Sequence, residues 1–271
     1  MELNIFDVEH GQCSLIKSKT GCIALIDAGT NSTTGWRPSD HLARLGYSYI
    51  ERLYVTNFDA DHTSDLENLE RNFHIGRFER NQSISGDDFY ALKQAGMDSG
   101  LRTAMYMTTK YVHPSPEDDF GDISFTTYYN IYSNEIKDTN NLSMVVFVEH
   151  PSVKLCFPGD LEQKGWEALL QRQSFRNEFS NVDILIASHH GRANGCSDAI
   201  FSSANCVPDI VIISDAGKQF SSQETADWYA ARVKGIPFNN GTIRKVLTTR
   251  KDGKIAISPT LGGGYHITTG A

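Results

Sequence analysis

Thr56-Asn57-Phe58-Asp59-Ala60-Asp61-His62 is the stretch of this 271-residue sequence that most strongly indicates both its fold and its chemistry. It begins where a predicted apolar strand ends, and it places two carboxylates and an imidazole close together. Such groups repel or desolvate one another unless a cation compensates them. In extended geometry Asp59 and Asp61 point to one side and His62 to the other, so the segment can surround two adjacent sites. The alternative interpretation is a helix start with Asp61 or Thr63 as its N-cap and Asp59 in a turn.

Two further polar motifs follow predicted apolar strands. Phe157-Pro158-Gly159-Asp160 combines a glycine, which lets the backbone approach closely, with a carboxylate able to bridge two ions. Taken alone, it also fits a strand-to-helix turn capped by Asp160. Ser188-His189-His190-Gly191 places adjacent histidines at a strand end, where at least one imidazole needs a partner such as a metal. Together, the three strand ends predict a hydrolytic site for one or two ions.

The order of the predicted elements favours an α/β protein with two sheets. Strands are predicted in two groups, each followed by helices, which favours two sheets covered by helices over one doubly wound sheet. We expect a single domain over residues 1–271, with an irregular insertion or lid at about 76–135, where the sequence is polar and rich in aromatic residues.

Composition excludes several classes of protein. The formal net charge of −8 argues against a broad basic surface for duplex DNA. The five cysteines form no Cys-x-x-Cys pair, so neither a disulfide framework nor a zinc knuckle is indicated. There is no apolar run of about 20 residues and no visible signal peptide, so we expect a cytoplasmic protein without a membrane segment.

Eight short segments in a fixed order connect the sequence to a known family. They comprise the 56–62 run and the segments Asp7-Val8-Glu9-His10-Gly11, Leu25-Ile26-Asp27-Ala28-Gly29, Asn140-Asn141-Leu142-Ser143, Gly159-Asp160, His189-His190-Gly191 and Ile213-Ser214-Asp215-Ala216-Gly217, with Thr249-Arg250-Lys251-Asp252-Gly253 as a closing segment. In this order they resemble the metallo-β-lactamase fold, and within it the hydrolase domain of the competence protein ComEC. The resemblance implies an αββα sandwich of two mixed sheets, with a metal site along one edge.

The resemblance also implies a ligand set for one or two divalent ions, zinc or manganese, with magnesium also compatible with the oxygen-rich donors. One ion would be held by Asp61, His62, Asp160 and one of His189 and His190, with Asp160 bridging to a second. The second ion would draw on Asn57, Asp59 and Asn141.

The sequence departs from the family pattern in three places. Asn57 stands where the family usually has histidine, and an amide oxygen is a weaker, neutral ligand. Ser64-Asp65 replaces the usual Gly-Gly, and the histidine often found after Ile-Ser-x-Gly is missing, with Ser221-Ser222-Gln223 in that stretch. The first departure bears on the second ion, and the third on a group that contacts substrate or donates a proton.

The function implied is that of a metal-dependent hydrolase, in which a metal-bound hydroxide attacks a phosphodiester of nucleic acid or of a small nucleotide. Asp59, Asp61 and His62 are the catalytic candidates, and Asp59 would act as general base if one ion binds. The candidates for substrate binding are Asn141, Ser143, Arg192 and Lys218.

Two other functions remain open on the sequence alone. A catalytically degenerate binding module would explain Asn57 and the missing histidine, although the other expected ligands are all retained. An ester or lactone hydrolase would keep the metal and change the bond. We expect no membrane partner, while a protein partner or a homo-oligomer is compatible with the sequence.

Overall fold

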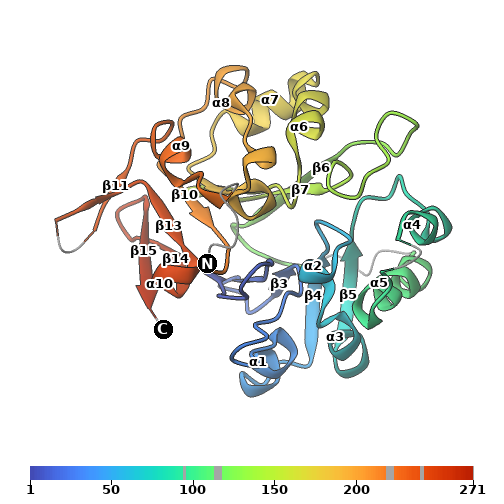
Figure 1. The fold of residues 1–271 in the computed structure, drawn as a ribbon. Helices are drawn as coiled ribbons and strands as arrows, with labels where there is room; N and C mark the ends of the chain where they lie inside the picture. Colours follow the sequence, from blue (N-terminus) through green and yellow to red (C-terminus); the bar gives the residue numbers. More distant parts are fainter. Residues whose placement is uncertain (94–95, 113–117, 218–222, 239–240, 271) are drawn as a thin grey trace.

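Two β-sheets lie face to face and carry helices on their outer surfaces (Figure 1). The computed structural model describes residues 1–93, 96–112, 118–217, 223–238 and 241–270. The predicted α/β architecture, with two mixed sheets covered by helices, is confirmed.

The first sheet has seven strands in the order β15-β14-β1-β2-β3-β4-β5. They are β1 (Glu2–Ile5), β2 (Ser14–Lys17), β3 (Ile23–Ile26), β4 (Tyr49–Tyr54), β5 (His74–Glu79), β14 (Lys254–Pro259) and β15 (Tyr265–Gly270). β3, β4 and β5 are parallel, and the remaining pairs are antiparallel. The carboxyl ends of β3 and β4 therefore open onto the same edge.

The second sheet has six strands in the order β13-β10-β9-β8-β7-β6. They are β6 (Ser124–Tyr129), β7 (Met144–His150), β8 (Val153–Phe157), β9 (Ile184–Ile186), β10 (Ile210–Ile213) and β13 (Val246–Thr248). β8, β9, β10 and β13 run parallel, so three successive loops leave this sheet at one edge. A separate hairpin pairs β11 (Ile236–Pro237) with β12 (Ile243–Arg244).

The alternation of side chains along the strands divides the core into layers. In β3, Ile23 and Leu25 pack toward the outer helices, whereas Ala24 and Ile26 pack between the two sheets. Both faces are buried, which explains why the strand sequences are apolar runs instead of alternating patterns.

Helices cover the outer face of each sheet (Figure 1). On the first sheet these are α1 (Pro38–Arg44), α3 (Leu66–Asn72), α4 (Gly86–Lys93) and α5 (Ser99–Lys110). On the second they are α6 (Gln163–Leu170), α7 (Gln173–Phe179), α8 (Asp198–Ser202) and α9 (Ala226–Ala230). Four shorter helical turns lie in loops: α2 (Ala60–Thr63), α10 (Thr249–Asp252) and the 3-10 turns η1 (Ser188–Gly191) and η2 (Ala193–Gly195). Within the described residues, no helix is both long and apolar enough to cross a bilayer.

The segment 76–135 is more regular than the sequence predicts. It contains most of β5, the helices α4 and α5, and β6. In α5, Leu101, Ala104 and Met107 are buried on one face, and the Asp98 side chain caps the first turn by accepting from the Leu101 N–H. The prediction of an irregular insertion was wrong in this respect, because the polar outer face of a surface helix weakens its apolar period.

Candidate metal centre

Four side chains bring nitrogen and oxygen atoms to one point between the sheet edges: Asp61, His62, Asp160 and His190. One such atom of each residue lies within 4.8 Å of the other three. His62 Nε2 is 3.0 Å from Asp160 Oδ1, and His190 Nε2 is 3.2 Å from that same oxygen. His190 Nε2 is also 3.2 Å from Asp61 Oδ2. The structure therefore brings together four of the residues that the sequence predicts as ligands of one ion.

Strand ends from both sheets position the four residues. Asp61 and His62 lie in α2, which follows β4 of the first sheet, while Asp160 and His190 follow the parallel neighbours β8 and β9 of the second. The Met144 N–H donates to the Thr56 carbonyl at 2.7 Å and joins the two sheets at this edge. Loops at the carboxyl ends of neighbouring strands meet in this way, which is why ligand sites recur there.

Two glycines of the sequence motifs let neighbouring loops close on Asp61. A Cβ at Gly11 would lie 2.5 Å from the Asp61 carbonyl oxygen, and a Cβ at Gly29 would lie 2.6 Å from it. Beside Gly29, the Ala28 N–H donates to the His62 carbonyl at 2.8 Å. The loops after β1 and β3 thus hold the backbone that carries two of the four side chains.

Asp27 fixes the orientation of the His62 ring. This carboxylate is fully buried, and its Oδ2 lies 2.9 Å from His62 Nδ1. Asp27 is itself held by the Thr56 N–H at 2.7 Å and by the Thr56 hydroxyl at 2.5 Å. Because Nδ1 faces a carboxylate, it carries the proton, and the Nε2 lone pair points into the cluster.

A backbone carbonyl does the same for His190. Its Nδ1 is 3.0 Å from the Ser214 carbonyl oxygen, which only accepts, so Nδ1 is protonated and Nε2 is the nitrogen that can offer a lone pair to an ion. His189 and His190 both adopt the left-handed region, with φ of 51° and 53°, and Gly191 follows at φ 70°. This unusual turn directs the His190 ring, and not the His189 ring, into the cluster.

The charges of the cluster fit a cation. Burial lowers the pKa of His62, but the carboxylates of Asp160, Asp27 and Asp61 raise it well above its usual range. Burial also lowers the pKa of His190, but the carboxylates of Asp160 and Asp61 outweigh it and raise this pKa to about 10. Burial raises the pKa of Asp160, yet His62 and His190 hold it well below its usual range.

The geometry of the two imidazoles also favours a cation. The Nε2 atoms of His62 and His190 are 3.3 Å apart, so two protons placed there would face each other. A divalent ion brings the same positive charge and accepts both lone pairs. Two imidazoles and two carboxylates, with no cysteine, suit zinc or manganese, and magnesium with lower preference. The residues present therefore fit one divalent ion.

Asp59 lies outside this cluster, in a corner formed with Asn57 and Lys93. The carboxylate forms an ion pair with the Lys93 ammonium at the end of α4. The Asn57 Nδ2 donates to Asp59 Oδ2 at 3.1 Å and to Asn140 Oδ1 at 3.2 Å. Asn57 Oδ1 is buried and has no hydrogen-bond partner among the described residues. In this orientation the amide presents its donor to the carboxylate, and the Lys93 ammonium faces the other carboxylate oxygen, so the predicted second ion would have to displace both donors.

His189 belongs to a neighbouring network instead of the four-residue cluster. Its Nδ1 lies 3.5 Å from Glu162 Oε1 but forms no hydrogen bond among the described residues. That oxygen accepts from Asn140 Nδ2 at 3.0 Å and from Asn194 Nδ2 at 2.7 Å. Burial lowers the pKa of His189, and the nearby charge of Arg192 lowers it further. Arg192, predicted to bind substrate, thus lies close to the site, whereas Lys218 falls outside the described residues.

Asn141 and Ser143 hold the site together and do not face an open surface. The Asn141 Oδ1 accepts from the Gly165 N–H at 2.7 Å, and its Nδ2 donates to Asp138 at 2.9 Å. The Ser143 hydroxyl, fully buried, accepts from the Asp160 N–H at 3.1 Å. These contacts give both residues a positioning role in the structure, while their predicted roles in substrate binding, and that of Asn141 at a second ion, stay predictions.

Known structures share this arrangement of sheets and helices. YhfI from Bacillus subtilis, a metallo-β-lactamase fold protein, aligns over 94% of this chain and 100% of its own with a TM-score of 0.51 and 10% identity. The chain has the metallo-β-lactamase fold. CmlA, a diiron β-hydroxylase from Streptomyces venezuelae, aligns with a TM-score of 0.53 and 13% identity over 94% of this chain and 53% of its own.

No protein-family model matches the sequence. Among curated proteins, it is similar to ComE operon protein 3 of Bacillus subtilis (strain 168), with 23% identity over 239 residues. The match covers 80% of this metallo-β-lactamase-fold chain but only 28% of the length of that protein.

Several residues at the edge of this metallo-β-lactamase fold were not predicted as site residues. Asp27 lies in a motif that the sequence analysis uses for the fold, so its position was visible although its contact with His62 was not. Ser214 acts through a backbone atom, which leaves no sequence signal. Lys93 comes from a helix without a motif. His10, whose ring centroid is 6.5 Å from that of His190, is contacted by Gln223 at 3.2 Å.

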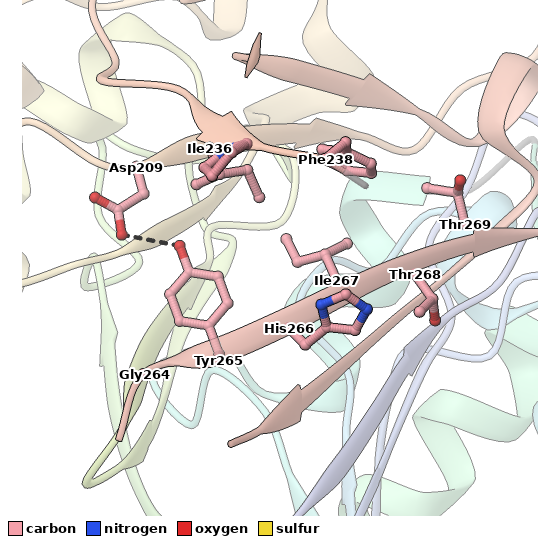
Figure 2. A pocket seen from close by; sticks show the side chains of 10 residues that line it. Asp209, Ile236, Phe238, Gly264, Tyr265, His266, Ile267, Thr268 and Thr269 are labelled. Atoms are coloured by element: carbon pink, nitrogen blue, oxygen red, sulfur yellow. Dashed lines mark hydrogen bonds between the residues drawn. The ribbon is translucent and has the colours of Figure 1, made fainter. Parts of the chain in front are cut away.

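A larger cavity, of about 570 Å³, lies away from the metal cluster, between β15 and the β11–β12 hairpin (Figure 2). Ile236, Phe238 and Ile267 line it, and the Tyr265 hydroxyl closes one side by donating to Asp209 at 2.9 Å. None of the four cluster residues lines this cavity. It offers apolar side chains and few charges, so it does not contribute to the candidate metal centre.

Proposed function

We propose that this chain is a hydrolase that depends on one divalent ion held by Asp61, His62, Asp160 and His190, and that it cleaves a phosphodiester in nucleic acid or in a small nucleotide. The observation that carries the proposal is the convergence of the His62 and His190 Nε2 atoms on Asp160 Oδ1, at 3.0 and 3.2 Å. Both rings are oriented through Nδ1, as ligand histidines commonly are.

The chemistry needs a Lewis acid and an activated water, and a bound divalent ion supplies both. The residues of the chain prepare the position for it. Asp27 and the Ser214 carbonyl keep the protons of His62 and His190 on Nδ1, and Ser143 holds the backbone of Asp160. Since Asp59 is paired with Lys93, we do not assign it the role of general base that the sequence suggests.

The choice of a phosphodiester draws on two further features. The motifs resemble the hydrolase domain of ComEC, and the chain is similar to part of ComE operon protein 3. Arg192 adds a cation near His189 and His10. Burial lowers the pKa of both histidines, and the charge of Arg192 lowers it further. With a net charge of −8, a strand end, a short strand or a dinucleotide is a better match than a long duplex.

Two alternative functions are tested beside the phosphodiesterase. An ester or lactone hydrolase would use the same ion on a carbonyl carbon. A binding module without catalysis is favoured by Asn57 in place of a histidine, although the ion-binding cluster is intact.

The test is a metal count by native mass spectrometry together with hydrolysis assays. Wild type, Asp160→Ala and the control Asp122→Ala, an exposed aspartate paired with Lys19, would be compared. Labelled single-stranded DNA, RNA, cyclic dinucleotides and a lactone would serve as substrates. We expect Asp160→Ala alone to lose the metal and the cleavage of a phosphodiester. A wild type that binds no manganese or zinc would refute the hydrolase, and lactone cleavage alone would move the activity to the ester class.

A further inference from the structure

We propose that Lys93 takes the place of a second metal ion, so that the site works with one divalent ion and one ammonium group. The inference rests on the proposed function, because it concerns how the hydrolytic site is charged. It starts from Asp59, which the family pattern assigns to metal and which the structure pairs with a lysine.

The position of Lys93 is set by packing. Phe58, the residue before Asp59, contacts Phe89 of α4 with ring centroids 4.6 Å apart. Phe58 and Phe89 are 7% and 1% exposed, so this contact anchors the helix beside the loop. Lys93 follows Phe89 by one helical turn, and residues four apart lie on one face of a helix. The same face of the helix therefore places the Lys93 ammonium beside Asp59 and the Phe89 ring against Phe58.

Both carboxylate oxygens of Asp59 are already occupied by donors. Oδ1 faces the Lys93 ammonium, and Oδ2 accepts from Asn57 Nδ2 at 3.1 Å and from the Thr139 hydroxyl at 3.3 Å. A divalent ion bound to Asp59 would lie beside a like charge, and at Oδ2 it would compete with the N–H and O–H donors that already occupy this oxygen. The Lys93 and Asp59 side chains are 20% and 27% exposed, so screening by water is incomplete.

An ammonium at this place differs from a metal in what it offers. Lysine has three N–H donors, and Asp59 uses part of that capacity, so an anionic oxygen of the substrate can be the next acceptor. A phosphoryl oxygen carries the charge that this arrangement matches. Lys93 would thus supply charge for a phosphodiester where a two-metal site would use its second ion.

The test is the number of Mn²⁺ ions per chain in excess manganese, by native mass spectrometry, with electron paramagnetic resonance to detect spin-coupled pairs. We expect one uncoupled ion in the wild type and two coupled ions in Lys93→Ala, because removing the ammonium frees Asp59. The double variant Lys93→Ala with Asp59→Asn should return to one. Lys93→Gln, which keeps most of the side-chain length, provides the same readings if the alanine variant does not fold.

The matched control is Lys110→Ala, since Lys110 of α5 pairs with Glu70 elsewhere on the same layer of helices. It should bind one ion like the wild type. Two ions in the wild type, or a single ion in both Lys93 variants, would overturn this inference and leave the hydrolase standing. No ion in the wild type would overturn the proposed function itself, and this inference with it.

Discussion

The carboxylates of the four-residue cluster and the carboxylate of Asp59 are neutralised in different ways. Asp61 and Asp160 converge with His62 and His190. Within the described part of the chain, no lysine or arginine forms an ion pair with either carboxylate. Asp59, only two residues before Asp61, is paired with Lys93. One group of carboxylates is arranged around an external cation, while the other is neutralised by the chain. A ligand motif in sequence thus does not establish how many ions its residues bind.

The largest effect is expected when the shared carboxylate of the cluster is removed. Asp160→Ala takes away the oxygen on which both Nε2 atoms converge, at 3.0 and 3.2 Å. Metal affinity should fall by more than the roughly 10–100-fold loss that is typical when a residue that orients a ligand is substituted, and hydrolysis should be lost. Competition with a fluorescent chelator measures the affinity. An unchanged affinity would show that the ion, if any, binds elsewhere.

The next effect separates the cluster from the corner. Asp27→Asn keeps the shape of the side chain but removes the carboxylate that orients His62, so metal affinity should fall roughly 10–100-fold. Asn57→Ala, in the corner, should change it by less than about tenfold, since we assign no ion there. Isothermal titration of both variants makes the comparison. A larger loss in Asn57→Ala than in Asp27→Asn would reverse our assignment of the two halves.

The pH dependence of metal binding is expected to be intermediate. In the metal-free protein the pKa of His190 is raised from 6.5 to about 10, so its stabilising contribution is full below pH 6.5 and is lost as pH rises toward 10. The pKa of Asp160 is lowered, so its ionised carboxylate stabilises the folded protein above the usual pKa range of an aspartate, and this contribution is lost as pH falls. An ion replaces the imidazole protons, so metal should raise Tm more at about pH 9 than at about pH 6. Equal shifts at the two pH values would contradict a site built from these histidines.

The smallest effect on activity is expected for Ser143→Ala. Its hydroxyl accepts from the buried Asp160 N–H, and leaving that donor without a partner costs about 1–3 kcal/mol. Urea unfolding should show this loss of stability, while KM for the substrate stays unchanged. A raised KM with unchanged stability would instead restore the substrate-binding role that the sequence suggests.

The fold and the cluster were accessible from sequence because their signals are local. Polar motifs follow apolar strands, and Asp61, His62 and Asp160 lie inside them. The choice between His189 and His190 was not accessible, because it depends on a left-handed turn and on the Ser214 carbonyl. Lys93 was not accessible either, since it reaches Asp59 across 34 positions from a polar helix without a motif.

The number of divalent ions per wild-type chain, counted by native mass spectrometry in excess manganese, tests the central claim most directly. We expect one ion, which is lost in Asp160→Ala and retained in Asp122→Ala. Two ions in the wild type would contradict the assignment of Lys93 to the second position. No ion at all would contradict the metal centre, and with it the proposed hydrolase.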